Sequence, residues 1–281
     1  MEVFTTTQKI FSKNAIYQKF EVLKTNCNKR YKYYEFFVEG VRNINEAVKN
    51  GWHICSFLYT REKPLSDWAQ NLLCTVSTDV NYELTYPLMQ DLSDKEDTSE
   101  LLAIVQMRTD NITQLSLSSN PVLALFHRPS NRGNLGTIIR SCDALGVEGL
   151  IITGHAVDLY DSDVIISSMG SFFRIPVIRM QNNQQVTELI AQLKQNYSNF
   201  QTVGTTAHKQ HPIYRLDLTV PTLFFIGNET DGLCKAFKEL CDIQATIPMD
   251  EKSSASSFNV GCAATVFFYE ASRQRNDNCC D

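Results

Sequence analysis

Short apolar runs alternate with helical patterns through the second half of the chain. Each run is bounded by proline or polar residues, which is typical of buried strands; the six runs are PVLALFH (121–127), GLIITG (149–154), PVIRM (176–180), QTVGT (201–205), TLFFIG (222–227) and IQATIPM (243–249). Apolar residues at helical spacing predict the helices between and after them, at about 136–145, 161–169, 186–196, 233–240 and 259–274. Strands that alternate with helices predict an α/β fold whose mostly parallel sheet is covered on both faces.

The first hundred residues mix the same two patterns. YEFFVEGVRNINEAVKNG (34–51) predicts a strand that runs into a helix, HICSFLYT (53–60) predicts the next strand, and the stretch up to LLAIVQM (101–107) predicts further helix and strand. The polar segment NITQLSLSSN, followed by Pro121, has loop chemistry. We therefore expect two domains, residues 1–110 and 121–281, joined by a linker at 111–120.

The composition narrows the class of protein. Hydrophobic residues make up 43% of the 281 positions, enough for a sizeable core, and no apolar run approaches the ~20 residues that cross a bilayer. The N-terminus lacks an apolar block followed by a cleavage site. The nine cysteines are odd in number and irregularly spaced, with no C-x-x-C pair. We expect a cytoplasmic protein with reduced thiols that binds neither a membrane nor a metal.

Charge alone does not decide whether the protein binds nucleic acid. The net charge is -5, which argues against a surface that is positively charged throughout and binds nucleic acid in that way. The first fifty residues nevertheless carry nine basic side chains against five acidic ones, and such a local excess can steer a polyanion. A solvated helix surface gives the same pattern, so RNA contact needs further support.

Polar residues gather in the loop after the first strand of the parallel sheet, HRPSNRGNLGTIIR (127–140). Its glycines have the spacing G-N-L-G rather than the G-x-G-x-x-G of a dinucleotide loop, which disfavours a nicotinamide-dependent enzyme. Asn134 and Arg140 stand near the start of one helix. Arg140 lies among apolar residues, where burial would require an anionic partner, so either a structural salt bridge or anion binding would explain it.

Two later loops follow strands of the same sheet. In FFIGNETDGL (224–233), Gly227 permits a positive φ or a close backbone approach, and the residues after it are typical of a helix cap. In IPMDEKSSASSFNVG (247–261), Ser257 and Asn259 precede an apolar helix, and capping accounts for one of them more readily than for both. Ligands of parallel sheets bind at the carboxyl ends of the strands, so these loops form the candidate site.

Taken together, the three loops resemble the motifs of the SpoU/TrmH branch of the SPOUT methyltransferases. That family carries N-x-G-x-x-x-R, a strand ending in G-x-E-x-x-G, and I-P-M followed by S-x-N-V and Y-E. The same patterns stand here at Asn134–Arg140, Gly227–Gly232 and Ile247–Glu270. The first domain is similar, more weakly, to the small ribosomal-protein-like RNA-binding domain that often precedes this catalytic domain.

The resemblance implies an S-adenosyl-L-methionine-dependent enzyme that methylates a ribose 2'-oxygen of RNA, with large-subunit ribosomal RNA favoured as the substrate. It also implies a deep trefoil knot in the C-terminal domain and a homodimer that completes the pocket. By motif position it assigns nine residues to the cofactor site, namely Thr205, Ala207, Ile226, Gly227, Asn228, Ile247, Met249, Ser257 and Phe258.

The resemblance also implies catalytic roles for Asn134, Arg140, Glu229, Ser257 and Asn259. Arg140 would stabilise an oxyanion or grip the adjacent phosphate, because a guanidinium holds its proton too tightly to act as an ordinary base. Asn134 would orient the ribose or phosphate, and Glu229 would hold Arg140 or Asn134 in place. Ser257 and Asn259 would fix their loop and touch the target nucleotide.

Two departures from the family pattern remove no motif residue, so we expect activity. The loop Asp250–Ser256 is longer than usual and has Glu251 where glycine is common, which bears on the choice of RNA, whereas the replacement of the usual leucine by Phe258 is a conservative apolar change. A transfer RNA ribose methyltransferase and a catalytically inactive knotted RNA-binding protein in ribosome assembly stay open as alternatives. The five histidines show no ligand spacing along the chain, which disfavours a metal-dependent hydrolase.

Overall fold

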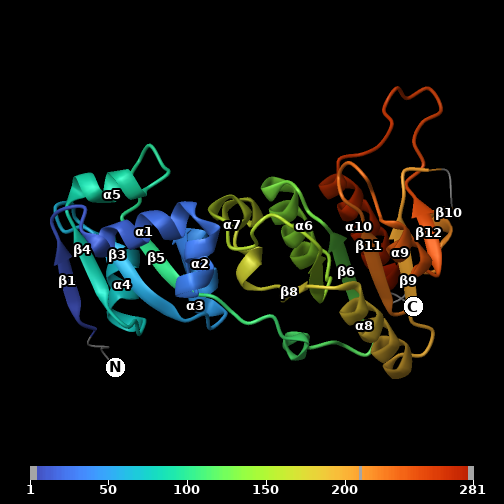
Figure 1. Ribbon diagram of the computed structural model, residues 1–281, viewed down its shortest axis with the longest axis horizontal. Helices are drawn as coiled ribbons and strands as arrows, with labels where there is room; N and C mark the ends of the chain where they lie inside the picture. The colour runs from blue at the N-terminus through green and yellow to red at the C-terminus, as the bar shows by residue number, and fades with distance from the viewer. Residues whose placement is uncertain (1–4, 209–210, 278–281) are drawn as a thin grey trace. The chain divides into compact units, whose positions relative to one another are not determined.

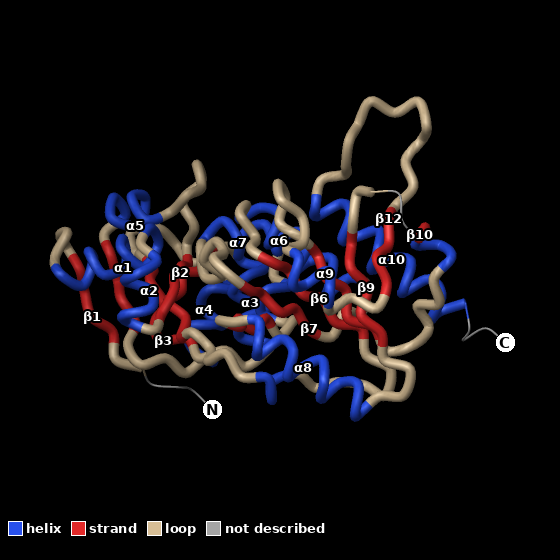
Figure 2. Tube along the Cα trace, turned by 45° about the vertical axis from the view of Figure 1, so that its right-hand side comes forward, coloured by secondary structure: helices blue, strands red, loops and turns tan. Residues whose placement is uncertain are grey.

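The computed structural model describes residues 5–208 and 211–277, which belong to two compact units (Figure 1). Unit 1 combines the residues up to 109 with residues 158–174, and unit 2 combines residues 110–157 with those from 175 onward. Each unit is built on its own β-sheet with flanking helices (Figure 2). No helix in the described ranges is long and apolar enough to cross a membrane.

Unit 1 contains a five-stranded mixed sheet with strand order β1-β4-β3-β5-β2. Strand β4 pairs in parallel with β1 and β3, whereas β5 runs antiparallel to β3 and β2. The strands are β1 (Thr7–Ile10), β2 (Glu35–Glu39), β3 (Ile54–Tyr59), β4 (Asn81–Leu84) and β5 (Leu101–Gln106). The helices are α1 (Ala15–Thr25), α2 (Cys27–Tyr33), α3 (Val41–Lys49), α4 (Asp67–Thr75), α5 (Tyr86–Leu92), α7 (Ser162–Ser168) and the 3-10 turn Ser171–Phe173.

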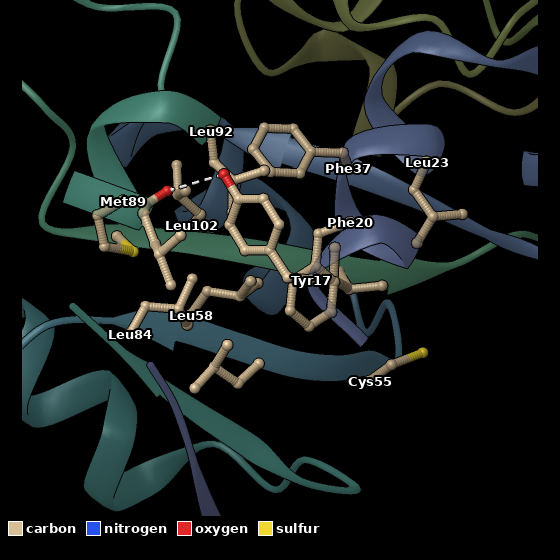
Figure 3. Packing of buried hydrophobic residues seen from close by; sticks show 13 residues of the cluster. Tyr17, Phe20, Leu23, Phe37, Cys55, Leu58, Leu84, Met89, Leu92 and Leu102 are labelled. Atoms are coloured by element: carbon tan, nitrogen blue, oxygen red, sulfur yellow. Dashed lines mark hydrogen bonds between the residues drawn. The ribbon is translucent and has the colours of Figure 1, made fainter. Parts of the chain in front are cut away.

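The core of unit 1 is an apolar cluster between the sheet and helices α1 and α5 (Figure 3). Tyr17, Phe20 and Leu23 project from α1 at helical spacing and are fully buried. The hydroxyl of Tyr17 donates to the carbonyl of Leu88 at 3.3 Å, which satisfies the one polar group of that side chain. Burial raises the pKa of Tyr17 to about 12, so the phenol stays neutral.

Residues 158–174 belong to unit 1 although their neighbours in sequence belong to unit 2. Arg30 of α2 is 1% exposed, and its Nε donates to Oδ2 of Asp158 at 2.7 Å. Its Nη2 lies 3.2 Å from a carboxylate oxygen of Asp161.

An aromatic cluster also joins residues 158–174 to β2 and to the loop before β3. Its rings are those of Phe36, Trp52, Tyr160, Phe172 and Phe173. Long-range packing therefore assigns this segment to a unit that its position in the sequence does not indicate.

Unit 2 contains a seven-stranded sheet with strand order β10-β12-β9-β11-β6-β7-β8, and every neighbouring pair is parallel. The strands are β6 (Val122–His127), β7 (Gly149–Thr153), β8 (Val177–Met180), β9 (Gln201–Thr205), β10 (His211–Pro212), β11 (Thr222–Ile226) and β12 (Ile243–Thr246). The helices are α6 (Arg132–Ala144), α8 (Asn183–Asn196), α9 (Lys235–Glu239), α10 (Val260–Asp277) and the 3-10 turns Ile112–Gln114 and Ile213–Arg215. The predicted parallel α/β fold is confirmed, and the knot stays a prediction.

Successive side chains of the central strand β11 pack against helices on opposite faces of the sheet. Phe225 belongs to the cluster that includes the apolar side of α8, and its ring lies 5.6 Å from that of Phe237 in α9. Phe224 instead contacts Phe267 and Phe268 of α10, with ring centroids 5.8 and 5.9 Å apart. Because both faces are covered, the strand is a continuous apolar run, which is why the sequence predicts it well.

The structure differs from the sequence prediction at several boundaries. Helix α6 begins at Arg132, four residues before the predicted start, because the side chain of Asn131 caps it by accepting from Asn134 N at 2.9 Å. The two-residue strand β10 was not predicted. The predicted linker 111–120 is not free chain, since Ile112 and Leu117 pack against the core of unit 2.

Candidate active site at the strand ends of unit 2

A cavity of about 350 Å3 opens at the carboxyl ends of β9, β11 and β12, beside the N-terminus of α10. Its size is within the range of small-molecule sites. Apolar side chains such as Ile226, Leu233 and Phe267 line it together with hydroxyl groups such as Thr206 and Thr246. The position agrees with the general rule for ligands of parallel sheets.

All nine residues that sequence motifs assign to the cofactor line this cavity, which are Thr205, Ala207, Ile226, Gly227, Asn228, Ile247, Met249, Ser257 and Phe258. Several other lining residues were not assigned to the site from the sequence, among them His208, Asp231, Lys238 and, from α10, Ala263, Ala264 and Phe267. Those of α10 carried no separate signal, because the same residues also fit an ordinary buried helix face.

Gly227 is required by the fold of its own turn. A Cβ at this position would collide with the backbone of Gly232 and lie 2.5 Å from the nitrogen of Leu233. Asn228 and Gly232 pair as a short bridge, with backbone N–O distances of 3.1 and 3.0 Å, and Gly232 has a φ of +67°. The two glycines of G-x-E-x-x-G therefore close a tight turn that presents Glu229 between them.

Glu229 is the centre of a hydrogen-bond network. Its carboxylate accepts from the amide and hydroxyl of Ser130 at 3.2 and 2.6 Å, from the amide of Asn131 at 3.2 Å and from Nδ2 of Asn134 at 3.2 Å. Partial burial disfavours the ionised form, but the hydrogen bonds, that of Ser130 foremost, outweigh it and lower the pKa of Glu229 below its ordinary value of 4.5. The carboxylate is therefore ionised at neutral pH.

Asn134 and Asn259 extend the network to the third motif. Nδ2 of Asn259 donates to Oδ1 of Asn134 at 3.1 Å. Oδ1 of Asn259 accepts from the backbone N–H groups of Gly261 and Cys262 at 2.9 and 3.3 Å, so the residue caps α10. One chain of hydrogen bonds thus joins the β11–α9 turn, the start of α6 and the start of α10, which carry the three motifs.

The two remaining predicted catalytic residues are exposed. Ser257 lines the cavity, whereas Arg140 lies on the outside of α6 and does not line it. Within the described parts of the chain no ion pair or hydrogen bond of the Arg140 side chain is present, so the expected need for a buried anionic partner does not arise. Of the two residues that Glu229 was expected to hold, the structure shows contact with Asn134.

The loop after β6 supplies donors that sequence reasoning missed. Ser130 and Asn131 bind Glu229, and Arg128 adopts a positive φ of +54°, which is uncommon for a residue other than glycine. The carbonyl of Arg128 accepts from Nδ2 of Asn228 at 2.7 Å, which helps to hold this conformation. In the sequence, the only indication of these donors was that two polar residues, Ser130 and Asn131, lie four and three positions before Asn134.

The sequence and the fold have counterparts among known proteins. A model described as the SpoU rRNA Methylase family matches residues 121–269, and one described as the SpoU L30e-like domain matches residues 14–103. The chain belongs to the SpoU rRNA methylase family. It is 40% identical over 269 residues to a 23S rRNA (uridine(2479)-2'-O)-methyltransferase of Streptomyces viridochromogenes, covering 95% of this chain and 93% of the relative. A 23S rRNA (guanosine(2553)-2'-O)-methyltransferase of Bacillus subtilis is 26% identical over 93% of this chain and 95% of its own length.

The fold agrees with that of a solved SpoU methyltransferase. The crystal structure of AviRb from Streptomyces viridochromogenes, in complex with the cofactor AdoMet, matches with a TM-score of 0.86 and 40% identity, covering 94% of this chain and all of the other. The SpoU/TrmH resemblance inferred from three short motifs is confirmed. The similarity extends over both parts of the chain, so it includes the N-terminal SpoU L30e-like domain as well.

Proposed function

We propose that this SpoU-family chain transfers a methyl group from S-adenosyl-L-methionine to a ribose 2'-oxygen of large-subunit ribosomal RNA. The observation that carries the proposal is the network through Glu229, Asn134 and Asn259, which joins all three motif loops beside a cofactor-sized cavity. The names of the Streptomyces and Bacillus relatives, both 23S rRNA 2'-O-methyltransferases, support the choice of RNA. The reaction on ribosomal RNA takes place in the cytoplasm.

The residues of the cavity fit a cofactor with a sulfonium centre. Its lining combines an apolar wall with the carboxylate of Glu229, which is ionised at neutral pH, whereas the carboxylate of Asp231 is paired with Arg128 at 3.1 Å. The ionised carboxylate of Glu229 favours a positively charged sulfonium. When bound, S-adenosyl-L-methionine supplies an electrophilic methyl group. The chain's own task is then to position and activate a ribose hydroxyl.

The network fixes the orientation of the Asn134 amide. Ionised Glu229 can only accept hydrogen bonds, so Asn134 presents its NH2 group to Glu229 and its carbonyl to Asn259. No second acceptor for that NH2 group is present among the residues that the structure describes, so one N–H remains for a ligand. We assign it to the ribose or phosphate of the target nucleotide, and we assign the neighbouring Ser257 and Asn259 to the same nucleotide.

Arg140 supplies positive charge to the reacting oxygen or to the adjacent phosphate. A guanidinium fork matches a phosphate, and it also stabilises charge that develops on an attacking oxygen. Its exposure in the single chain fits a pocket that is completed across a homodimer. The exposed side of α10 supports such a dimer, because Val266 and Tyr269 are 38% and 55% exposed there.

The two domains divide the work. We assign residues 1–110 to RNA binding, residues 111–120 to the connection and residues 121–281 to catalysis. The match of the SpoU L30e-like domain to residues 14–103 supports this division, as does the basic excess of the first fifty residues.

The test is transfer of labelled methyl groups from S-adenosyl-L-methionine to ribosomal and transfer RNA. We expect label in large-subunit ribosomal RNA at a linkage that resists alkali, because alkaline cleavage needs a free 2'-hydroxyl. Arg140→Ala should lower the rate at least about a hundredfold while calorimetric cofactor affinity stays unchanged. Arg215→Ala, an exposed arginine elsewhere in unit 2, is the control and should retain activity.

Other outcomes separate the alternatives. Label in transfer RNA alone would replace the proposed substrate. Cofactor binding without label in any RNA, including ribosome assembly intermediates, would favour an inactive RNA-binding protein.

A further inference from the structure

Three potential metal ligands lie together in unit 1, far in sequence from the catalytic motifs. One donor atom from each of His53, Cys55 and Asp79 lies within 4.8 Å of the other two. Nε2 of His53 is 3.1 Å from Oδ2 of Asp79. Among the residues that the structure describes, this is the single group of three histidine, cysteine or acidic side chains close enough to share a metal ion. Linear spacing could not indicate it, because Asp79 lies in the loop between α4 and β4.

The backbone directs the cysteine toward the other two residues. Strand pairing between β3 and β5 shifts register between Ile54 and Ser56, so Cys55 is the extra residue of a bulge. Bulges change the direction of a side chain and occur next to functional sites. In Figure 3 the sulfur of Cys55 points away from the apolar side chains of the cluster.

The loop that carries Asp79 is tied to the same bulge. The carbonyl of Cys55 accepts from the backbone N–H groups of Asp79 and Val80, at 3.0 and 3.3 Å. Cys55 is nearly buried, whereas the side chains of His53 and Asp79 are exposed and can rotate. One ligand is therefore held by the fold, while the other two are exposed side chains that can turn toward a shared ion, for which zinc sets ligand distances of about 2.0–2.3 Å.

The charge around the thiol also favours a cation. Glu35 and Asp79 both act electrostatically on Cys55, and Lys19, which pairs with Glu35 at 2.6 Å, offsets part of their charge. A divalent cation that binds here replaces the thiol proton: the S–H bond breaks, a sulfur–metal bond forms and the proton passes to solvent.

We propose that His53, Cys55 and Asp79 form a site for a borderline divalent cation of the Zn2+ class. Sulfur, imidazole nitrogen and carboxylate oxygen are the donors that zinc takes in proteins, and the exposure of two ligands leaves a fourth position for water. The bound cation crosslinks the start of β3 to the loop before β4. It stabilises unit 1 and takes no part in methyl transfer.

Cobalt titration of the full-length protein tests the site, because Co2+ replaces Zn2+ and reports sulfur ligation by charge-transfer absorption. The background is C279S/C280S, since adjacent thiols can bind cobalt themselves. We expect one equivalent of Co2+ to produce the sulfur charge-transfer band and Zn2+ to abolish it. His53→Gln, at an exposed position, should weaken cobalt affinity about tenfold or more and retain the band at higher cobalt.

Matched cysteine variants complete the test. Cys55→Ser should lose the band, whereas Cys74→Ser, at an exposed position on α4, should keep it. At the same zinc concentration, the Tm should rise more in the parent protein than in His53→Gln. A folded parent without the band, or a band that survives Cys55→Ser, would overturn the proposal.

Discussion

Units 1 and 2 each contain a charged side chain with many hydrogen bonds, but the two side chains differ in burial and in access to a ligand. Arg30 of unit 1 is 1% exposed, and all of its hydrogen-bond donors have partners. Its guanidinium binds the carboxylates of Asp158 and Asp161 and donates to two backbone carbonyls of α1. Glu229 of unit 2 is half-buried and lines a cavity.

The difference separates structural from functional polar groups. Around Arg30 every donor ends on an acceptor of unit 1 itself, so nothing remains for a ligand. Around Glu229 the network ends on Asn134, which keeps one N–H without a partner among the described residues, and on Asn259 at the start of α10. A polar cluster with an unused donor beside a cavity is thus a better indication of function than the number of its hydrogen bonds.

The largest effect should come from breaking the saturated cluster. Arg30→Met leaves two carboxylates without their cation, and loss of one partner of a buried ion pair costs about 3–5 kcal/mol. We expect the free energy of unfolding, measured by urea titration, to fall by that amount. Lys32→Met, at an exposed position on the same helix, is the control and should change it by less than about 0.5 kcal/mol.

The comparison also predicts that Arg30→Met protein binds the cofactor normally as long as it is folded. Under conditions in which the variant is fully folded, its cofactor affinity, measured by calorimetry, should equal that of the parent chain. A lowered affinity in fully folded protein would show that the Arg30 cluster is more than structural.

A smaller effect should come from Asn259, where capping and the network can be separated. Asn259→Ala removes the α10 cap and should cost about 1 kcal/mol of stability. Asn259→Asp keeps an oxygen for the cap but has no N–H for Asn134, so stability should be retained while methyl transfer falls about tenfold or more. Equal activity of Asn259→Asp and the parent in a methyl-transfer assay would show that the contact with Asn134 is dispensable.

The smallest effect concerns pH. The pKa of Glu229 is lowered in the folded chain, so ionised Glu229 stabilises the fold fully above 4.5, its ordinary value. That contribution is lost as the pH falls through the lowered value. The stability difference between the parent and Glu229→Gln, from urea titrations at several pH values, should therefore shrink below about 4.5. A difference that grows in acid would contradict the assigned ionisation.

Sequence patterns predicted the strands of unit 2 because parallel strands covered on both faces are continuous apolar runs. They also predicted the residues around the cavity, since motif residues follow directly after β11 and β12. The exposure of Arg140 and the donors Ser130 and Asn131 escaped prediction, because both depend on how α6 lies against distant loops. The assignment of residues 158–174 to unit 1 depends on contacts with Arg30, more than a hundred residues away. Short-range patterns in the sequence do not reveal contacts between such distant residues.

The path of the chain has a consequence for anyone who wishes to divide this protein. Residues 158–174 leave unit 2 and return to it, so the backbone passes between the units at three points rather than at one. A fragment that ends near residue 110 would keep Arg30 without either carboxylate and would uncover the rings of Phe36 and Trp52. The N-terminal unit is thus not a contiguous gene segment, and an isolated N-terminal fragment would need residues 158–174 grafted onto it.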